Sequence, residues 1–364
     1  MKIICILANL SQPRCIKRVK SLQEGGHDVS VYGFCRGLYD VNEFPSSIKV
    51  NNWGKIESGT GYLSRLCKVY KNLKTIFRKH KDESVIYYCF SFEAALITSL
   101  FTKRKFFYEI SDLIYCYSNS QVFKWLFGNI DKFIIRRSFR TVLTSGGFFE
   151  YLYKKDVESN NEKIIIQPNK LSTYFQDIER TILKRESHFR FAYIGAFRYP
   201  NTIFRFARII GEKFPNHEFS FYGDSSLTYL AKELAEKYPN VHYYGKFKNP
   251  EELSSIYENV DIVTACYDIE MGENEKVAEP NKLYEAMAFC KPIIVSKDTY
   301  LSKRVEKLGV GFSIDANNDD SIIDFITGLS VDELKKKSLN SYKLPKTEFI
   351  DSPDLILSSL CKNY

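Results

Sequence analysis

The sequence predicts an α/β protein with two doubly wound domains, each built on a parallel β-sheet with helices on both faces. Apolar strand-like runs alternate with helical stretches along the chain, which is the pattern of parallel sheets covered on both faces. The length of 364 residues is long for one core and comfortable for two domains. The alternation breaks near residues 168–186, where Pro168-Asn169-Lys170 and a charged stretch from Glu179 to Ser187 indicate a linker.

We expect the first domain over residues 1–170. Its apolar runs are short, rich in β-branched and aromatic residues, and therefore typical of buried strands. The predicted strands are Ile3–Ala8, Val29–Phe34, Val85–Phe90, Lys105–Ile110, Thr141–Thr144 and Ile164–Gln167. The stretches between them carry apolar residues at helical spacing. They predict helices near 13–25, 61–80, 92–102, 120–138 and 146–154.

We expect the second domain over residues 171–345, followed by a closing segment over 346–364 that forms a helix or a pair of turns. Its predicted strands are Phe189–Ile194, Glu218–Tyr222, Val241–Tyr244, Asp261–Ala265, Pro292–Val295 and Gly311–Ile314. Helices are expected near 201–213, 226–238, 250–258, 281–290 and 298–307. In such folds a ligand binds at the carboxyl ends of the strands, which we expect to face a central cleft between the domains.

The composition excludes several classes of protein. No run of eighteen apolar residues occurs, so no transmembrane helix is predicted, and Met1–Leu7 is interpreted as a first buried strand rather than a signal peptide. Nine cysteines, without a CxxC pair and several within apolar runs, favour reduced thiols in a cytosol. Five scattered histidines lack metal-ligand spacing, so no metal site is expected. A dinucleotide dehydrogenase is disfavoured because no G-x-G-x-x-G follows the first strand.

Charge is unevenly distributed between the two halves. Residues 1–170 carry 27 lysines and arginines against 15 acidic residues, whereas residues 171–364 carry 25 against 29. Basic residues lie among Phe123, Trp125, Leu126 and Phe127 at helical spacing, which suits a surface that lies on an anionic membrane. The alternative is a solvated helix face above ordinary core aromatics.

The most informative stretch is residues 279–296. It combines a helix start at Pro280, an inward stripe at helical spacing, a stop at Lys291-Pro292 and a strand buried on both faces. Lys282 is the unusual residue, because a cation in the first turn opposes the helix macrodipole. A negative partner is therefore expected: either Glu285, one turn along the same face, or a phosphate bound at the helix N-terminus.

This stretch and several other segments of the chain each match part of the sequence pattern of one protein family. The stretch Pro280-x-Lys282-x-x-Glu285-Ala286-Met287-Ala288-x-x-Lys291-Pro292-Ile293-Ile294 is the most specific. The others are Tyr193-Ile194-Gly195-Ala196-Phe197-Arg198, Phe219–Gly223, Val241–Phe247, Asp261-Ile262-Val263, Pro13-Arg14-x-x-Lys17 and Leu22-x-x-x-Gly26-His27-Asp28-Val29. Together they resemble bacterial glycosyltransferases of the GT-B fold, with two Rossmann-like domains, in the family 4 or group 1 type that builds capsule, exopolysaccharide or O-antigen. The resemblance covers almost the whole chain.

The resemblance implies transfer of a sugar from a UDP- or GDP-linked donor to a lipid-linked or growing polysaccharide acceptor. We expect a cytoplasmic protein without a cofactor or a nucleic-acid partner, and its basic first half suits a peripheral position on the inner face of the membrane. No metal ion is expected if Lys282, Arg198 and the helix dipole stabilise the departing diphosphate. A carboxylate at Glu285 would accept from the ribose hydroxyls, while Lys282 and Arg198 would contact the diphosphate. The other donor-site residues implied are Gly195, Gly223, Gly245, Lys246, Phe247, Glu279, Asn281 and Leu283.

Simpler interpretations of these residues remain open. Glu285 and Lys282 could form an ordinary helical pair worth about 0.2–0.5 kcal/mol. Arg198 could be a solvated loop arginine, and Gly223 and Gly245 could be turn glycines without a ligand.

Two departures from the family pattern leave the stereochemical course open. Retaining members carry two glutamates, and the first would fall at Val277 here, while Glu273, Glu275 and Glu279 are out of register. The usual Gly-Arg step is Gly195-Ala196, with the arginine delayed to Arg198.

Attention therefore turns to Asp112, which follows a predicted strand in the first domain and is similar in placement to the catalytic aspartate of inverting relatives. We predict that Asp112 is the general base for the acceptor hydroxyl. The alternatives are that it caps the next helix, or that Glu93 is the base.

Two other classes of function compete with the transferase. A sugar-nucleotide epimerase of the same fold would need no basic apolar face. A non-enzymatic two-domain sugar-binding protein usually has a secretion signal, which the sequence does not indicate.

Overall fold

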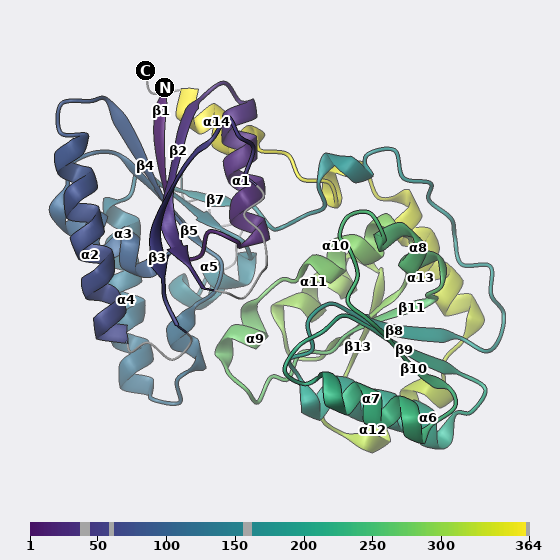
Figure 1. Cartoon of the computed structure of the whole chain (residues 1–364). Helices are drawn as coiled ribbons and strands as arrows, with labels where there is room; N and C mark the ends of the chain where they lie inside the picture. The colour runs from purple at the N-terminus through teal and green to yellow at the C-terminus, as the bar shows by residue number, and fades with distance from the viewer. Residues whose placement is uncertain (37–43, 58–61, 156–161, 362–364) are drawn as a thin grey trace. The chain divides into compact units, whose positions relative to one another are not determined.

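The computed structural model describes residues 1–36, 44–57, 62–155 and 162–361, and the chain divides into two compact units. The first is Met1–Pro168 with Ser352–Tyr364, and the second is Asn169–Asp351. Each unit contains one sheet in which every strand pair is parallel (Figure 1). The predicted α/β fold with two doubly wound parallel sheets is confirmed.

The first unit has a seven-stranded sheet. Its strand order is β3 (Lys49–Lys55), β2 (Asp28–Cys35), β1 (Lys2–Leu7), β4 (Val85–Cys89), β5 (Phe106–Ile110), β6 (Arg140–Leu143) and β7 (Ile164–Ile166). The order reverses between β1 and β4, so the connections leave a crevice at their carboxyl ends. Its helices are α1 (Pro13–Glu24), α2 (Tyr62–Lys79), α3 (Phe92–Phe101), α4 (Gln121–Arg137), α5 (Gly146–Tyr153) and α14 (Asp354–Cys361).

The second unit has a six-stranded sheet. Its order is β10 (Val241–Gly245), β9 (Glu218–Tyr222), β8 (Arg190–Ile194), β11 (Ile262–Ala265), β12 (Ile293–Ser296) and β13 (Gly311–Ile314). The reversal falls between β8 and β11. The helices are α6 (Arg205–Lys213), α7 (Thr228–Lys237), α8 (Leu253–Glu258), α9 (Glu273–Val277), α10 (Asn281–Ala288), α11 (Tyr300–Leu308), α12 (Asp319–Thr327) and α13 (Val331–Lys343).

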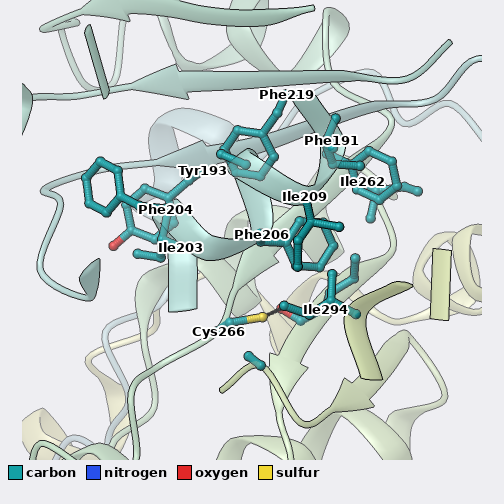
Figure 2. Close-up of a cluster of buried hydrophobic side chains, with 14 of the residues drawn as sticks. Phe191, Tyr193, Ile203, Phe204, Phe206, Ile209, Phe219, Ile262, Cys266 and Ile294 are labelled. Carbon is teal, nitrogen blue, oxygen red and sulfur yellow. Dashed lines mark hydrogen bonds between the residues drawn. The ribbon is translucent and has the colours of Figure 1, made fainter. Parts of the chain in front are cut away.

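Strand β8 shows why these runs are apolar throughout. Successive side chains of a strand point to opposite faces of the sheet. Phe191 and Tyr193 pack with α6 in one buried cluster (Figure 2), whereas Ala192 and Ile194 belong to a second cluster that contains α10 residues. Because both faces are covered, neither set of positions can be polar, and the strand reads as a continuous hydrophobic run.

Each of the twelve predicted strands forms, and one further strand, β3, was not predicted. It lies at the edge of its sheet, and its residues are mostly half-buried or exposed, so its sequence lacks an apolar run. Helices α9, α12 and α13 were also not predicted. The last helix, α14, packs on the first unit, where Ile356 and Leu360 are buried in the core around β1. No helix in the described ranges is long and apolar enough to cross a membrane.

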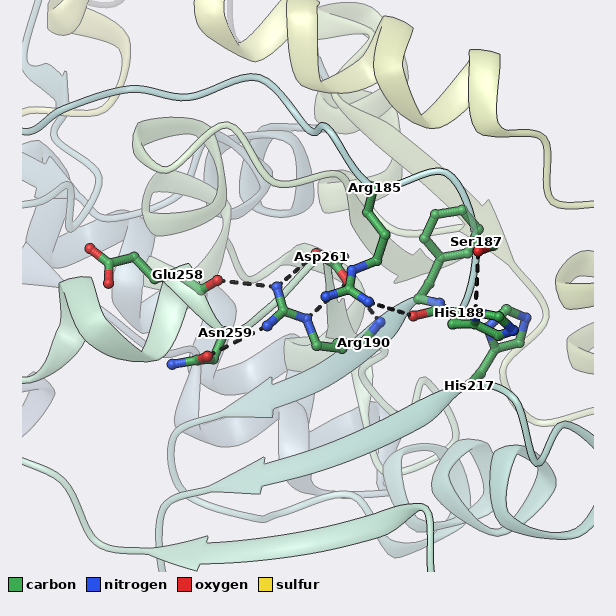
Figure 3. Close-up of polar contacts among 9 residues, drawn as sticks. Arg185, Ser187, His188, Arg190, His217, Glu258, Asn259 and Asp261 are labelled. Carbon is green, nitrogen blue, oxygen red and sulfur yellow. Dashed lines mark hydrogen bonds and ion pairs between the residues drawn. The ribbon is translucent and has the colours of Figure 1, made fainter.

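A buried ion-pair network fixes the starts of β8 and β11 (Figure 3). The Asp261 carboxylate is 2 % exposed and accepts hydrogen bonds from the Arg190 backbone N–H at 2.9 Å and from Nε at 3.1 Å. Arg190 Nη2 lies 3.0 Å from the other oxygen, and Arg185 Nε adds an ion pair at 2.9 Å. The carboxylate therefore holds two neighbouring strands and the segment that leads into the second unit.

We expect Asp261→Ala to lower the free energy of unfolding by about 2–4 kcal/mol, because it leaves two guanidinium groups without their carboxylate. The loss stays below that of a fully buried pair since the two arginines are partly exposed. Urea unfolding followed by circular dichroism measures it. Asp324→Ala, at an exposed position of α12, is the matched control and should change stability by less than about 0.5 kcal/mol. Equal effects of the two variants would contradict a structural role for Asp261.

Candidate active site

Three glycines follow three neighbouring strands of the second unit. Gly195 comes directly after β8, Gly223 after β9, and Gly245 ends β10; all three have positive φ, at +123°, +137° and +80°. The Gly195 N–H donates to the Tyr222 carbonyl and the Gly223 N–H to the Gly245 carbonyl, both at 2.7 Å. A Cβ at Gly223 would lie 2.1 Å from the Gly195 carbonyl oxygen. Only glycine allows the ends of β8 and β9 to approach so closely.

Lys282 reaches the same strand ends from the first turn of α10. Its Nζ lies 4.4 Å from the centroid of the Tyr193 ring and 3.1 Å from the position that a Cβ would take at Gly195. A cation over an aromatic face is attracted by the ring quadrupole. No ion pair of Lys282 occurs in the part of the chain that the structure describes. Lys282 and Glu285 therefore do not form an ion pair. The Lys282 charge nevertheless acts on Glu285, because it opposes the rise in the pKa of Glu285 that burial causes.

Glu285 lies on the next turn of α10 and is 6 % exposed. Its Oε2 accepts a hydrogen bond from the Tyr257 hydroxyl at 3.0 Å. Burial raises the pKa of this carboxyl, and Lys282 and the Tyr257 hydroxyl oppose the rise. Burial disfavours the ionised form of the Glu285 carboxyl. The Lys282 charge and the Tyr257 hydroxyl favour that form and partly offset the effect of burial.

The other predicted contacts of the donor lie around these strand ends. Arg198 is exposed, and its charge opposes the rise in the pKa of Tyr193 that burial causes. Lys246 is exposed and lies 3.5 Å from an Asp224 carboxylate oxygen, while Phe247 packs against the buried cluster that contains α10.

Three predicted residues of the α10 segment have structural contacts. Glu279 is buried, accepts from the Tyr284 hydroxyl and lies 3.4 Å from Arg304 Nε. Asn281 is exposed and accepts from the Asn169 amide at 2.8 Å, and Leu283 is fully buried in the core. These contacts hold the start of α10 in place, directly before Lys282.

In the first unit, Asp112 follows β5 and is exposed at a cavity of about 190 Å³. The cavity lies at the carboxyl ends of β1, β2, β4 and β5, where the strand order reverses. The next α-helix, α4, is capped by Ser120, whose side chain accepts from the Phe123 N–H, so Asp112 is not the cap of that helix. The 3₁₀-helix Ile114–Tyr117, which follows Asp112, has Leu113 at its N-cap.

Several charged groups surround this cavity. Glu109 is buried, lies 3.3 Å from Arg18 Nε and 3.7 Å from Arg14 Nε, and accepts from the Tyr88 hydroxyl at 2.6 Å. Arg65 forms an ion pair with Glu93 at 2.7 Å. Arg14 had a sequence signal in the Pro13-Arg14 pattern and Glu93 as the alternative base, whereas the sequence did not predict that Glu109 would lie against two arginines.

A further carboxyl group of the cavity is buried and contacts a tyrosine. Asp131, on α4, accepts from the Tyr108 hydroxyl at 2.7 Å. Burial raises the pKa of Asp131 to about 6, and the tyrosine hydroxyls oppose that rise. This carboxyl is thus less acidic than an ordinary aspartate, and it is already hydrogen-bonded.

Two doubly wound units, each with a parallel sheet whose strand order reverses, are the architecture of a GT-B fold protein. Residues 175–343 match the family described as Glycosyl transferases group 1. The second unit is accordingly a group 1 glycosyl transferase domain, and the chain is a glycosyltransferase. No protein with curated annotation matched the chain.

Solved structures of the same fold cover the whole chain. Sucrose-phosphate synthase from Thermosynechococcus elongatus is 12% identical with a TM-score of 0.70, over 100% of this chain and 98% of that one. A glycosyltransferase from Rickettsia africae is 14% identical with a TM-score of 0.65, over 99% and 97%. Anabaena HepE, solved in complex with UDP and glucose, is 15% identical with a TM-score of 0.65, over 100% of both chains. At these identities the likeness establishes the fold.

Proposed function

We propose that the chain transfers a sugar from a UDP- or GDP-linked donor, held at the ends of β8, β9 and β10, to a lipid-linked or growing polysaccharide acceptor. The observation that carries the proposal is the position of Lys282. Its ammonium lies beside Gly195 and over the Tyr193 ring, in the first turn of a helix whose dipole opposes a cation. A diphosphate at this point would offset both the cation and the positive helix end.

The roles of the remaining residues follow from the chemistry of a sugar nucleotide. Lys282 and Arg198 contact the diphosphate, and Glu285 accepts from the ribose hydroxyls as a carboxylate. Backbone groups of Gly245, Lys246 and Phe247 hold the base, while Gly195 and Gly223 allow the ligand to approach the backbone. Glu279, Asn281 and Leu283 act through α10, because they fix its start. The complex of Anabaena HepE with UDP supports a uridine nucleotide as the first candidate.

Departure of the nucleoside diphosphate builds negative charge on its phosphates. Fixed cations and helix N–H groups stabilise such charge when they are already in place. Lys282, Arg198 and the start of α10 supply them, so transfer needs no metal ion. Asp112 takes the proton of the acceptor hydroxyl as that oxygen attacks the anomeric carbon.

We expect Lys282→Ala to weaken binding of the nucleoside diphosphate about 10–100-fold, the loss of one charged hydrogen bond. Glu285→Gln should weaken it similarly at neutral pH. Because burial raises the pKa of Glu285, its carboxylate is protonated at a higher pH than that of an ordinary glutamate, so the affinity should fall as the pH is lowered from neutral into the acidic range. Isothermal titration calorimetry measures both effects.

Two controls separate these causes. Lys237→Ala removes an exposed cation at the end of α7 and should leave the affinity unchanged. Glu285→Gln measured over the same pH range retains the titration of the ligand phosphates but lacks that of the carboxyl. An identical pH dependence in the wild type and Glu285→Gln would remove Glu285 from the ribose contact.

Asp112→Asn should lower kcat by about 10²–10⁴ and leave the affinity for the nucleoside diphosphate unchanged, since only the proton transfer is lost. A thermal-shift panel first identifies the tightest sugar nucleotide. Its diphosphate release is then followed with and without a polyprenyl-linked oligosaccharide, in buffer that contains EDTA. Asp82→Asn, exposed and outside the cavity, is the control. Near-normal turnover of Asp112→Asn would rule out the base, and dependence on added metal would refute metal independence.

The proposed acceptor is lipid-linked, and one surface of the first unit suits an anionic membrane. Four apolar side chains in the first half of α4 are exposed: Val122, Phe123, Trp125 and Leu126. Lys124 and Lys132 line the same shallow groove as Trp125. Exposed aromatic and aliphatic side chains with lysines beside them are the composition of a helix that lies in a membrane interface. We place the protein at the cytoplasmic face of the membrane on this basis.

Flotation with phosphatidylglycerol liposomes tests this face. The wild type should bind and be released by salt, whereas Val122→Ser combined with Trp125→Ser should bind at least about tenfold less, because two apolar side chains are no longer buried in lipid. Tyr229→Ser, at an exposed position of α7, should bind like the wild type. Equal flotation with phosphatidylcholine, or none with either lipid, would contradict the assignment.

A further inference from the structure

A shallow depression of about 400 Å³ lies at the amino ends of strands in the second unit. Residues 181–185 line it together with residues that begin or shortly precede three neighbouring strands: Arg190 on β8, Asp261 before β11 and Lys291 before β12. Every lining residue belongs to the second unit and lies in the described ranges. Because the strands are parallel, this edge of the sheet is opposite to the carboxyl ends, where the donor site is proposed.

Four cations and one carboxylate line the depression. The cations are Lys184, Arg185, Arg190 and Lys291, and the carboxylate is Asp261. Asp261 lies within ion-pair distance of both arginines, 2.9 Å from Arg185 Nε and 3.0 Å from Arg190 Nη2 (Figure 3). One carboxylate neutralises one of the four charges, so the lining carries a surplus of three positive charges.

The acidic side chains around the depression lie outside its lining. Glu186 is exposed and pairs with Lys335 at 3.0 Å. Glu258 is exposed, and its carboxylate points away from Arg190 in Figure 3, where its backbone carbonyl accepts from that arginine. Glu218, at the exposed start of β9, acts on Arg190 through its charge. Water and salt screen charges as exposed as these, so the surplus inside the depression persists.

Three of the cations keep hydrogen-bond donors that the described residues do not use. Lys291 is half-buried, and its ammonium forms no hydrogen bond or ion pair with any residue that the structure describes. Lys184 is exposed and also lacks such a partner among those residues. Arg185 uses Nε for Asp261 and Nη1 for the His188 carbonyl, which leaves Nη2 without a partner in the same ranges. These donors are therefore available to a ligand in the depression.

The end of α10 does not account for the position of Lys291. A cation is favoured at a helix C-terminus because the last carbonyl groups lack partners. Here the carbonyls of Met287 and Ala288 already accept from the Arg180 guanidinium, both at 3.3 Å. Burial lowers the pKa of Lys291, and the Asp261 charge opposes this only in part. A half-buried ammonium without a partner is costly, and an anion bound beside it would remove that cost.

We propose that this depression binds a phosphate group, held by Lys291, Lys184 and Arg185. A phosphate monoester carries about 1.5 to 2 negative charges at neutral pH and has three strong acceptor oxygens, which suits the surplus and the open donors. Lysine binds phosphate as a point charge, and the arginine fork binds its oxygens in pairs. The site is separate from the proposed donor site and does not rest on the transferase function. Its phosphate can belong to a soluble compound or to a lipid headgroup.

Titration calorimetry on the full chain at constant ionic strength tests the binding. The probes are inorganic phosphate, glycerol 3-phosphate and neutral glycerol, each added to protein saturated with UDP so that the donor site does not contribute. Both phosphate probes should bind, and glycerol should give no detectable binding. Lys291→Gln should weaken phosphate binding about 10–100-fold, the loss of one charged hydrogen bond, and Lys291→Arg should restore part of it.

Two further variants locate the site. Lys184→Gln changes an exposed side chain, so the fold tolerates it, and should weaken phosphate binding about 2–5-fold, as expected for one exposed charge pair. Lys213→Gln removes an exposed cation in the last turn of α6, outside the depression, and should have no effect. Circular dichroism confirms that each variant is folded.

Liposomes that contain phosphatidic acid separate the two sources of the phosphate. The Val122→Ser and Trp125→Ser variant is used as the background, because it lacks the proposed lipid-binding side chains of α4. A further loss of flotation on adding Lys291→Gln assigns the phosphate to a headgroup, and no further loss assigns it to a soluble compound.

The inference is overturned if neither phosphate probe binds, if glycerol binds as tightly as glycerol 3-phosphate, or if Lys291→Gln binds phosphate like the wild type. UDP affinity of Lys291→Gln, measured separately, should equal that of the wild type. Failure of UDP to bind would contradict the donor site and leave the phosphate site standing, since the two sites have no residue in common.

Discussion

The close approach of two backbone turns is the constraint on which the proposed donor site depends. The carbonyl of Gly195 occupies the space that any side chain at Gly223 would need, and the hydrogen bonds from Gly195 to Tyr222 and from Gly223 to Gly245 continue the ladder past the strand ends. The carboxyl ends of β8, β9 and β10 therefore stay close to one another. A flat backbone surface without side chains results, and Lys282 lies directly beside it. The glycines therefore shape the floor of the site through contacts with one another.

The positions of Lys282 and Glu285, the two charged residues of α10 beside these turns, lower the stability of the fold. Lys282 lies over the aromatic face of Tyr193 at the positive end of α10, and none of the carboxylates in the described ranges is within ion-pair distance of it. Glu285 is buried, and burial raises its pKa above the ordinary value. A raised pKa in the folded state means that this carboxyl stabilises the fold when protonated, and that the contribution is lost as the pH rises through the raised pKa. At neutral pH both groups therefore favour a bound partner over an empty site.

The sequence predicted the sheets better than the contacts. Buried strands such as β8 leave a continuous apolar run because both of their faces are covered, but the edge strand β3 has no such run and was missed. The glycine turns were also predicted, since left-handed backbone at a strand end requires that residue type. The partners of Glu279 were not, because Arg304 lies on a different helix, 25 residues further along. Arg36 and Arg65 were likewise missed, since only the fold brings them to the same cavity.

Three buried glutamates in the two units show how the surroundings of a carboxylate indicate its use. Glu109 has two guanidinium groups and a tyrosine hydroxyl, and Glu279 has Arg304 and a tyrosine hydroxyl. Among the residues that the structure describes, Glu285 has only the Tyr257 hydroxyl as a hydrogen-bond partner of its side chain and forms no ion pair, although the Lys282 charge acts on it. A buried carboxylate without an ion pair is costly, and perturbed groups of this kind concentrate at functional sites. Of the three, Glu285 is the one whose remaining acceptor capacity a ligand's hydroxyl groups would complete, whereas the other two are already balanced by the protein itself.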